Sequence, residues 1–110
     1  MNIETRELKH VSVVKISGRV DSSTAPKVEA ALHDLINSDR HQVVLDLLEV
    51  EYMSSAGLRV LVTTLKAAKK SGGDLKIAQL SPRVKEVLDL SGLTPVFNVY
   101  SDVVEAVGAF

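Results

Sequence analysis

The sequence predicts a single α/β domain with a mixed, mostly parallel sheet of four to five strands and about four helices. Its 110 residues match the commonest length of one domain, so we expect residues 1–110 to fold as one unit. Strand-like apolar runs alternate with segments of helical periodicity, which is the order of parallel strands joined by right-handed crossovers. Two strands at the start are separated only by Lys9 and His10, a connection that fits an antiparallel hairpin.

The first half of the chain is expected to contain this hairpin and one helix. The hairpin strands cover residues 2–8 and 11–17, and Gly18 ends the second strand. Apolar residues at helical spacing then predict a helix over residues 27–37. Pro26 suits the first turn of that helix.

The second half continues with alternating strands and helices. A nearly continuous apolar run over residues 43–48 predicts a strand covered on both faces. A helix with one apolar face follows over residues 55–70. The remaining expected elements are a strand at residues 75–78, a helix from Ser81 to Ser91, a short edge strand at 96–100 and a last helix at 103–107.

Composition and charge narrow the classes of function. Thirteen basic and fourteen acidic residues give a net charge of −1, without the positive excess that nucleic acid binding needs. The absence of cysteine excludes disulfides, thiolate catalysis and cysteine metal sites. The charged N-terminus differs from a signal peptide, and no apolar run approaches the roughly 18 residues that span a bilayer. We therefore expect a cytoplasmic protein that binds neither nucleic acid nor membrane.

No residue pattern indicates an enzyme. His10, His33 and His41 lack the spacing of a helical metal site, and each is expected to be a solvated or half-buried residue. Ser54 and Ser55 do not lie in a Gly-x-Ser-x-Gly elbow, and the chain has no glycine-rich phosphate loop. We expect no catalytic residue, no metal and no cofactor.

Ser54 and Ser55 stand at the start of the helix over residues 55–70. The local sequence favours a structural interpretation, in which Ser54 caps the helix and Ser55 is its first residue. The alternative is phosphorylation, because a phosphate on Ser55 would lie beside the unpaired amides of the helix N-terminus. Such a phosphate would change the charge and shape of the surface without unfolding the domain.

Lys66, Lys69 and Lys70 form a basic group near the end of the same helix. Cations at this end interact favourably with the helix dipole, so a solvated helix terminus is the favoured interpretation. Docking of an acidic partner is the alternative.

Three segments of the chain form a family pattern: DLLEVEYMSSAGL at residues 46–58, GRVDSSTA at 18–25 and SGL at 91–93. Together with the chain length and the order of elements, they resemble the STAS domains, and within them the stand-alone anti-sigma factor antagonists of bacteria. The resemblance covers essentially the whole chain and implies one STAS domain over residues 1–110.

The resemblance implies a partner-switching regulator. Such a protein binds an anti-sigma factor that is also a serine kinase, and so frees a sigma factor. The kinase phosphorylates the serine matching Ser55, the phosphoprotein no longer binds, and a separate phosphatase restores it. The residues expected at the partner surface are Asp21, Ser22, Ser23, Thr24, Ser54, Ala56, Gly57 and Arg59. The protein is expected to be a monomer or a weak dimer.

Two of these positions keep alternatives open. Gly57 lets a partner's backbone approach closely, or it is the small residue that packing of the helix on the sheet requires. Ser54 stands where the family commonly has aspartate before the phosphorylated serine, so two hydroxyls are adjacent. Ser55 is the expected acceptor and Ser54 the second candidate.

Two other functions are consistent with the sequence. A scaffold or transporter-associated STAS module would bind another protein constitutively, with the two serines acting only as caps. A weak nucleotide- or anion-binding module would use Asp21, Thr24 and the helix start at Ser55.

Overall fold

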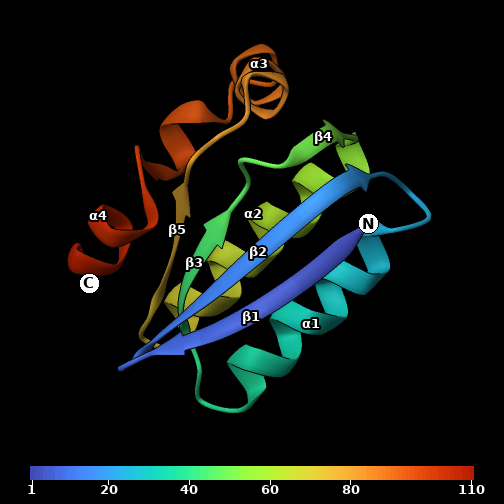
Figure 1. Ribbon diagram of the computed structural model, residues 1–110. Helices are drawn as coiled ribbons and strands as arrows, with labels where there is room; N and C mark the ends of the chain where they lie inside the picture. Colours follow the sequence, from blue (N-terminus) through green and yellow to red (C-terminus); the bar gives the residue numbers. More distant parts are fainter.

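The computed structural model describes residues 1–110 as one mixed sheet with helices on both faces (Figure 1). The strands are β1 (Asn2–Leu8), β2 (Val11–Val20), β3 (Gln42–Asp46), β4 (Val50–Met53), β5 (Asp74–Ala78) and β6 (Asn98–Tyr100). The sheet order is β1-β2-β3-β5-β6, and β4 pairs with β2. β1 is antiparallel to β2, and all other pairings are parallel. The predicted α/β class, hairpin and mostly parallel sheet are confirmed, with six strands instead of four to five.

Four helices connect and follow the strands, as predicted. They are α1 (Ala25–Asn37), α2 (Ser55–Lys70), α3 (Pro82–Leu90) and α4 (Val103–Gly108), and a short 3₁₀ turn spans Thr94–Val96. The side chains of Ser54, Ser81 and Asp102 accept amide hydrogen bonds from the first turns of α2, α3 and α4, as N-cap residues do. None of the helices is both long enough and apolar enough to cross a membrane.

The second strand continues past Gly18, so the expectation that this glycine ends it is wrong. Gly18 has a φ of +93°, which glycine adopts without strain, and the strand register shifts between Gly18 and Arg19. The strand bends at this irregularity instead of stopping. Its first part pairs with β3 and its last part pairs with β4.

The apolar run over residues 43–48 is divided in the structure. β3 ends at Asp46, whose carboxylate accepts a hydrogen bond from the amide of Leu48 at 3.2 Å. Leu48 is 51% exposed, so the run is not covered to its end. β4 follows, with Glu51 and Tyr52 both exposed, and this pair breaks the alternation by which a strand is recognised in sequence.

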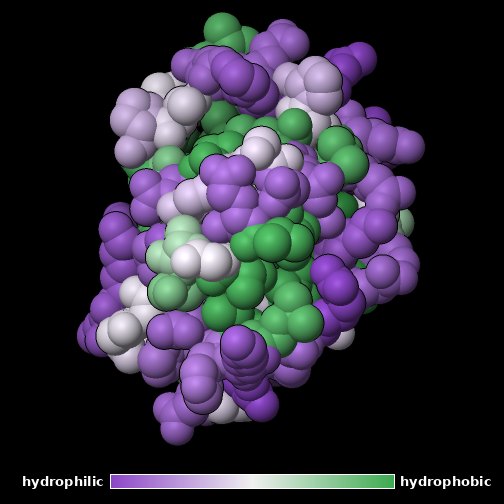
Figure 2. All heavy atoms as spheres, turned by 60° about the vertical axis from the view of Figure 1, so that its left-hand side comes forward, coloured by the Kyte–Doolittle hydropathy of each residue, from purple (hydrophilic) through white to green (hydrophobic).

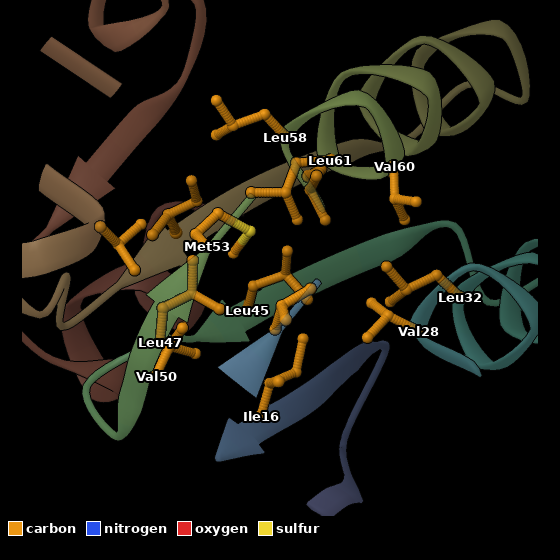
Figure 3. Close-up of a cluster of buried hydrophobic side chains, with 14 of the residues drawn as sticks. Ile16, Val28, Leu32, Leu45, Leu47, Val50, Met53, Leu58, Val60 and Leu61 are labelled. Carbon is orange, nitrogen blue, oxygen red and sulfur yellow. The ribbon is translucent and has the colours of Figure 1, made fainter. Parts of the chain in front are cut away.

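Two apolar clusters hold the layers together. The larger lies between the sheet and the helices α1, α2 and α3, with Leu45, Leu61 and Leu32 among its buried side chains (Figure 3). The smaller lies under α4, where Val44 contributes from β3 to the opposite face of the sheet. α1 and α2 therefore cover one face side by side, and α4 covers part of the other (Figure 1).

Apolar side chains also reach the surface on the side of α4. Seen from that side, a patch of apolar atoms is surrounded by polar ones (Figure 2). The exposed large hydrophobic residues of the C-terminal segment are Val96, Val99, Val104 and Phe110. This surface is separate from the face covered by α1 and α2.

Candidate functional site

Pairing of β2 with β4 brings two distant segments of the chain together. The register places the ends of the two strands opposite each other, and the amide of Ser54 donates a hydrogen bond to the carbonyl of Val20 at 2.8 Å. The loop after β2 and the start of α2 therefore lie side by side at one edge of the molecule. Ser22 from the loop and Ala56 from α2 line the same small groove, together with Arg59.

The two adjacent serines differ in their surroundings. Ser54 is half-buried and its hydroxyl accepts a hydrogen bond from the amide of Gly57 at 3.3 Å, so its predicted role as the N-cap of α2 is confirmed. Ser55 is exposed, and its hydroxyl has no hydrogen-bond partner in the structure. The amides of Ser55 and Ala56 belong to the first helical turn, which has no acceptors within the helix. Ser55 therefore presents a free hydroxyl in the positive field of the helix N-terminus.

Replacing Ser54 by alanine is expected to destabilise the fold by about 1 kcal/mol, because the amide of Gly57 loses its capping acceptor. Ser54→Asp should retain wild-type stability, since aspartate is an equally good cap and its charge suits the helix N-terminus. Urea denaturation of the three proteins measures both effects. Equal midpoints for Ser54→Ala and wild type would show that the cap contributes nothing.

The loop after β2 is held by its first residue. The Asp21 carboxylate accepts hydrogen bonds from the hydroxyl of Ser23 at 2.7 Å, the amide of Ser23 at 3.0 Å and the amide of Thr24 at 3.2 Å. These bonds, led by that of the Ser23 hydroxyl, hold the pKa of Asp21 below its usual value. Thr24 in turn accepts from the amide of Asp21 and donates to the carbonyl of Arg19, each at 2.9 Å. The loop is therefore a preformed polar surface beside α2.

The lowered pKa of Asp21 predicts a pH dependence of stability. Because the folded pKa lies below the unfolded value, the carboxylate stabilises the fold above the unfolded pKa, and this contribution is lost as pH falls through the folded pKa. Asp21→Asn should therefore flatten the decrease in melting temperature between about pH 5 and pH 2. Melting curves followed by circular dichroism over that range provide the measurement. Parallel curves for the two proteins would contradict the predicted role of these hydrogen bonds.

Gly57 is in the first turn of α2 and is buried. A Cβ atom at this position would overlap the sulfur of Met53 and would come within 2.8 Å of Cγ1 of Val20. The space is therefore filled from the side of the sheet. Of the two interpretations of Gly57, the structure supports the requirement of helix–sheet packing.

One known family model matches nearly the whole chain. The STAS domain model matches residues 2–106. The chain belongs to the STAS domain family. The resemblance seen in the three sequence segments is thereby confirmed.

Named relatives of this STAS domain are anti-sigma factor antagonists. The anti-sigma-B factor antagonist of Staphylococcus epidermidis is 34% identical over 99 residues, which are 90% of this chain and 92% of the relative. The crystal structure of an anti-sigma factor antagonist from Mycobacterium paratuberculosis is 30% identical, with a TM-score of 0.88 over 98% of this chain and 92% of that one.

One protein of the same fold has been solved in two chemical states. SpoIIAA in its unphosphorylated form gives a TM-score of 0.84 at 18% identity, over 96% of this chain and 93% of that one. The phosphorylated form of Bacillus SpoIIAA gives 0.78 at 16% identity, over 98% of both chains. At these identities the likeness shows the STAS fold alone.

The structure gathers the predicted surface residues of this STAS domain around the start of α2. The exposed or half-exposed members are Asp21, Ser22, Ser23, Thr24, Ser54, Ser55, Ala56 and Arg59. Gly57 is the exception, because it is buried against the sheet. The groove between the loop and α2 has a volume of about 170 Å³, which is below the usual ~300–1,000 Å³ of small-molecule pockets. Asp21, Thr24 and Ser55, the residues of the nucleotide-binding alternative, do not line this groove and share no other pocket of the structure.

Two exposed residues beside this surface were not singled out from the sequence. The guanidinium of Arg19 lies over the ring of Tyr52 at 4.4 Å, and its Nε is 4.0 Å from Asp21. Tyrosine and arginine are enriched among the residues that dominate protein interfaces. The sequence signal was weak, because pairing of Arg19 with Tyr52 depends on the strand β4, which was not predicted.

The three histidines lie apart from this surface. His10 is in the hairpin turn, His33 is on α1 and His41 precedes β3, as the sequence indicated. The structure contains no cluster of three or more side chains arranged to hold a metal ion.

Proposed function

We propose that this STAS domain is an anti-sigma factor antagonist that binds a serine-kinase anti-sigma factor and so releases a sigma factor. The named relatives of similar length support this class of function. The polar surface made by the loop after β2 and the start of α2 is the proposed contact surface. Phosphorylation of Ser55 switches the binding off.

The single observation that favours Ser55 over Ser54 as the acceptor is the difference between their hydroxyls. The Ser54 hydroxyl is half-buried and occupied as the helix cap. The Ser55 hydroxyl is exposed and has no hydrogen-bond partner. A kinase reaches the exposed Ser55 hydroxyl directly, whereas the Ser54 hydroxyl is half-buried and is engaged with the amide of Gly57.

The helix N-terminus makes phosphorylation of Ser55 compatible with the fold. A phosphate brings nearly two negative charges to the positive end of the helix dipole, where anions are stabilised. The domain stays folded, and the change is confined to the charge and bulk of the surface. SpoIIAA, which shares the fold, exists in a phosphorylated form, and this precedent supports the proposal.

The remaining parts of the proposal concern the protein's localisation, its oligomeric state and the enzymes that add and remove the phosphate. The protein is a non-enzymatic cytoplasmic regulator that acts as a monomer or weak dimer. A separate phosphatase removes the phosphate and restores binding. The catalytic base for phosphorylation belongs to the kinase, so the chain needs no catalytic residue of its own.

The proposed function is tested with a serine-kinase anti-sigma factor from the same organism. The wild-type chain is incubated with this kinase and ATP, and the products are mapped by mass spectrometry. Phosphate on Ser55, absent from Ser55→Ala and retained in Ser54→Ala, is the expected result. A kinase that binds the chain but leaves both serines unmodified would exclude the switch and favour constitutive binding.

A further inference from the structure

The helix α2 has an unusual distribution of charge. Its 16 residues include four cations, namely Arg59, Lys66, Lys69 and Lys70, and no acidic residue. The chain as a whole has 13 basic and 14 acidic residues, so the rest of the chain carries nine basic and 14 acidic residues, and the positive charge is concentrated on this helix. None of the five ion pairs in the structure involves α2. The four charges are therefore free to interact with another molecule.

The helix dipole explains only half of these charges. Lys69 and Lys70 lie in the last turn, where cations are favourable. Arg59 lies near the positive end of the helix, where a cation gains nothing from the dipole. Lys66 precedes the last turn and lacks an acidic neighbour on the helix. The dipole therefore does not account for Arg59 and Lys66.

These two cations line one groove. It has a volume of about 400 Å³ and runs along α2 from Ser55 to Lys66, with Leu93 after α3 closing its other side. Its lining residues are Ser55, Leu58, Arg59, Val62, Thr63, Lys66 and Leu93. The α2 members recur at spacings of three and four, so they form a single stripe on the helix. The groove has an apolar floor, a cation towards each end and no carboxylate.

We propose that this groove, which we call the α2 groove, docks an acidic, partly apolar segment of the anti-sigma factor. The inference rests on the proposed function and extends its contact surface from the first turn of α2 to Lys66. Charge complementarity selects the occupant, because the groove offers unpaired cations beside Leu58 and Val62. The groove also begins at Ser55, so it is continuous with the proposed switch.

This position connects docking to phosphorylation. Ser55 and Arg59 are four residues apart, and side chains at this spacing lie next to each other on a helix. A phosphate on Ser55 therefore pairs with Arg59 and cancels the positive charge at that end of the α2 groove. The acidic segment then meets negative charge where it had met a cation. Docking weakens because Arg59 then pairs with the phosphate instead of with the acidic segment.

A charge reversal tests the electrostatic part of this proposal. Lys66→Glu should weaken binding of the anti-sigma factor about tenfold and reduce the dependence of affinity on salt concentration. Lys69→Glu is the matched control, because it makes the same change in net charge on the same helix outside the groove. Its affinity should stay within about twofold of wild type. Equal losses for both variants would indicate a general field effect and would overturn the docking site.

Protection of a single thiol from alkylation tests the location of the docking site without changing the charge of the α2 groove. The chain has no cysteine, so Thr63→Cys places one exposed thiol in the groove and Ala109→Cys places one beyond α4. Bound anti-sigma factor should slow alkylation of Cys at position 63 at least about tenfold and leave position 109 unchanged. Circular dichroism confirms that each variant is folded.

The possible outcomes separate the two proposals. If the anti-sigma factor binds the wild-type chain but leaves position 63 unprotected and tolerates Lys66→Glu, the α2 groove is not a docking site and the proposed function stands. If it does not bind the wild-type chain at all, the proposed function fails and the docking inference fails with it.

Discussion

Addition of ATP to the complex of this STAS domain with its kinase is expected to release the STAS domain, and the Ser55→Ala complex is expected to survive the same treatment. The physical reason is the arrival of nearly two negative charges at a surface that was neutral or cationic. Desolvating an unmatched charge in an interface costs about 3 kcal/mol, which corresponds to roughly a 100-fold loss of affinity. Size-exclusion chromatography before and after ATP addition measures the release.

Three variants control this experiment. Ser55→Ala should bind as wild type, because the hydroxyl has no partner within the domain. Ser54→Ala should still be released by ATP, since its loss affects the cap and not the acceptor. Ser55→Asp should bind more weakly than wild type but more tightly than the phosphoprotein, because it adds only about one charge. Release of the Ser55→Ala complex by ATP would contradict Ser55 as the switch.

Replacement of Gly57 by alanine is expected to destabilise the fold by about 1–2 kcal/mol. A methyl group at this position would overlap Met53 and approach Cγ1 of Val20 to 2.8 Å. Overpacking of this kind costs ~1–3 kcal/mol, whereas alanine regains at most about 1 kcal/mol through helix propensity. The flexible methionine side chain moves aside more easily than the branched valine on β2. The expected decrease in melting temperature is about 5–10 °C.

Gly108→Ala is the matched control for this substitution. Gly108 also lies in a helix, α4, but a Cβ atom there would meet no other atom within 4 Å. Thermal denaturation of the two variants therefore separates the loss of space from the change in backbone propensity. A Gly57→Ala protein that is as stable as Gly108→Ala would mean that the helix moves away from the sheet without cost.

Local sequence patterns predicted best those features of the fold that depend on one residue or one short segment. The two-residue connection predicted the hairpin, and Ser54 predicted the start of α2. The strand β4 was missed, because recognition of a strand depends on alternation and Glu51 and Tyr52 are both exposed. Gly18 was misjudged because a glycine with positive φ serves a turn and a bulge equally well, and only the partner strand distinguishes them.

The candidate site shows the same division between local and long-range information. The first residues of α2 were recognisable from sequence, as was the polar loop from Asp21 to Thr24. Their proximity depends on the pairing of β2 with β4, so it followed from the family resemblance and not from the local pattern. The α2 groove was beyond sequence reasoning, because Leu93 reaches it from a different part of the chain. The basic residues of α2 could be identified from the sequence, but their lack of ion-pair partners could not.

The central claim is that a phosphate on Ser55 prevents binding of the anti-sigma factor. The most direct test is calorimetric titration of the anti-sigma factor with two homogeneous chains: the unphosphorylated chain and the chain with phosphoserine at position 55. The proposed switch predicts tight binding of the first and a loss of roughly 100-fold or more for the second. Equal affinities of the unphosphorylated chain and the chain with phosphoserine at position 55 would contradict it.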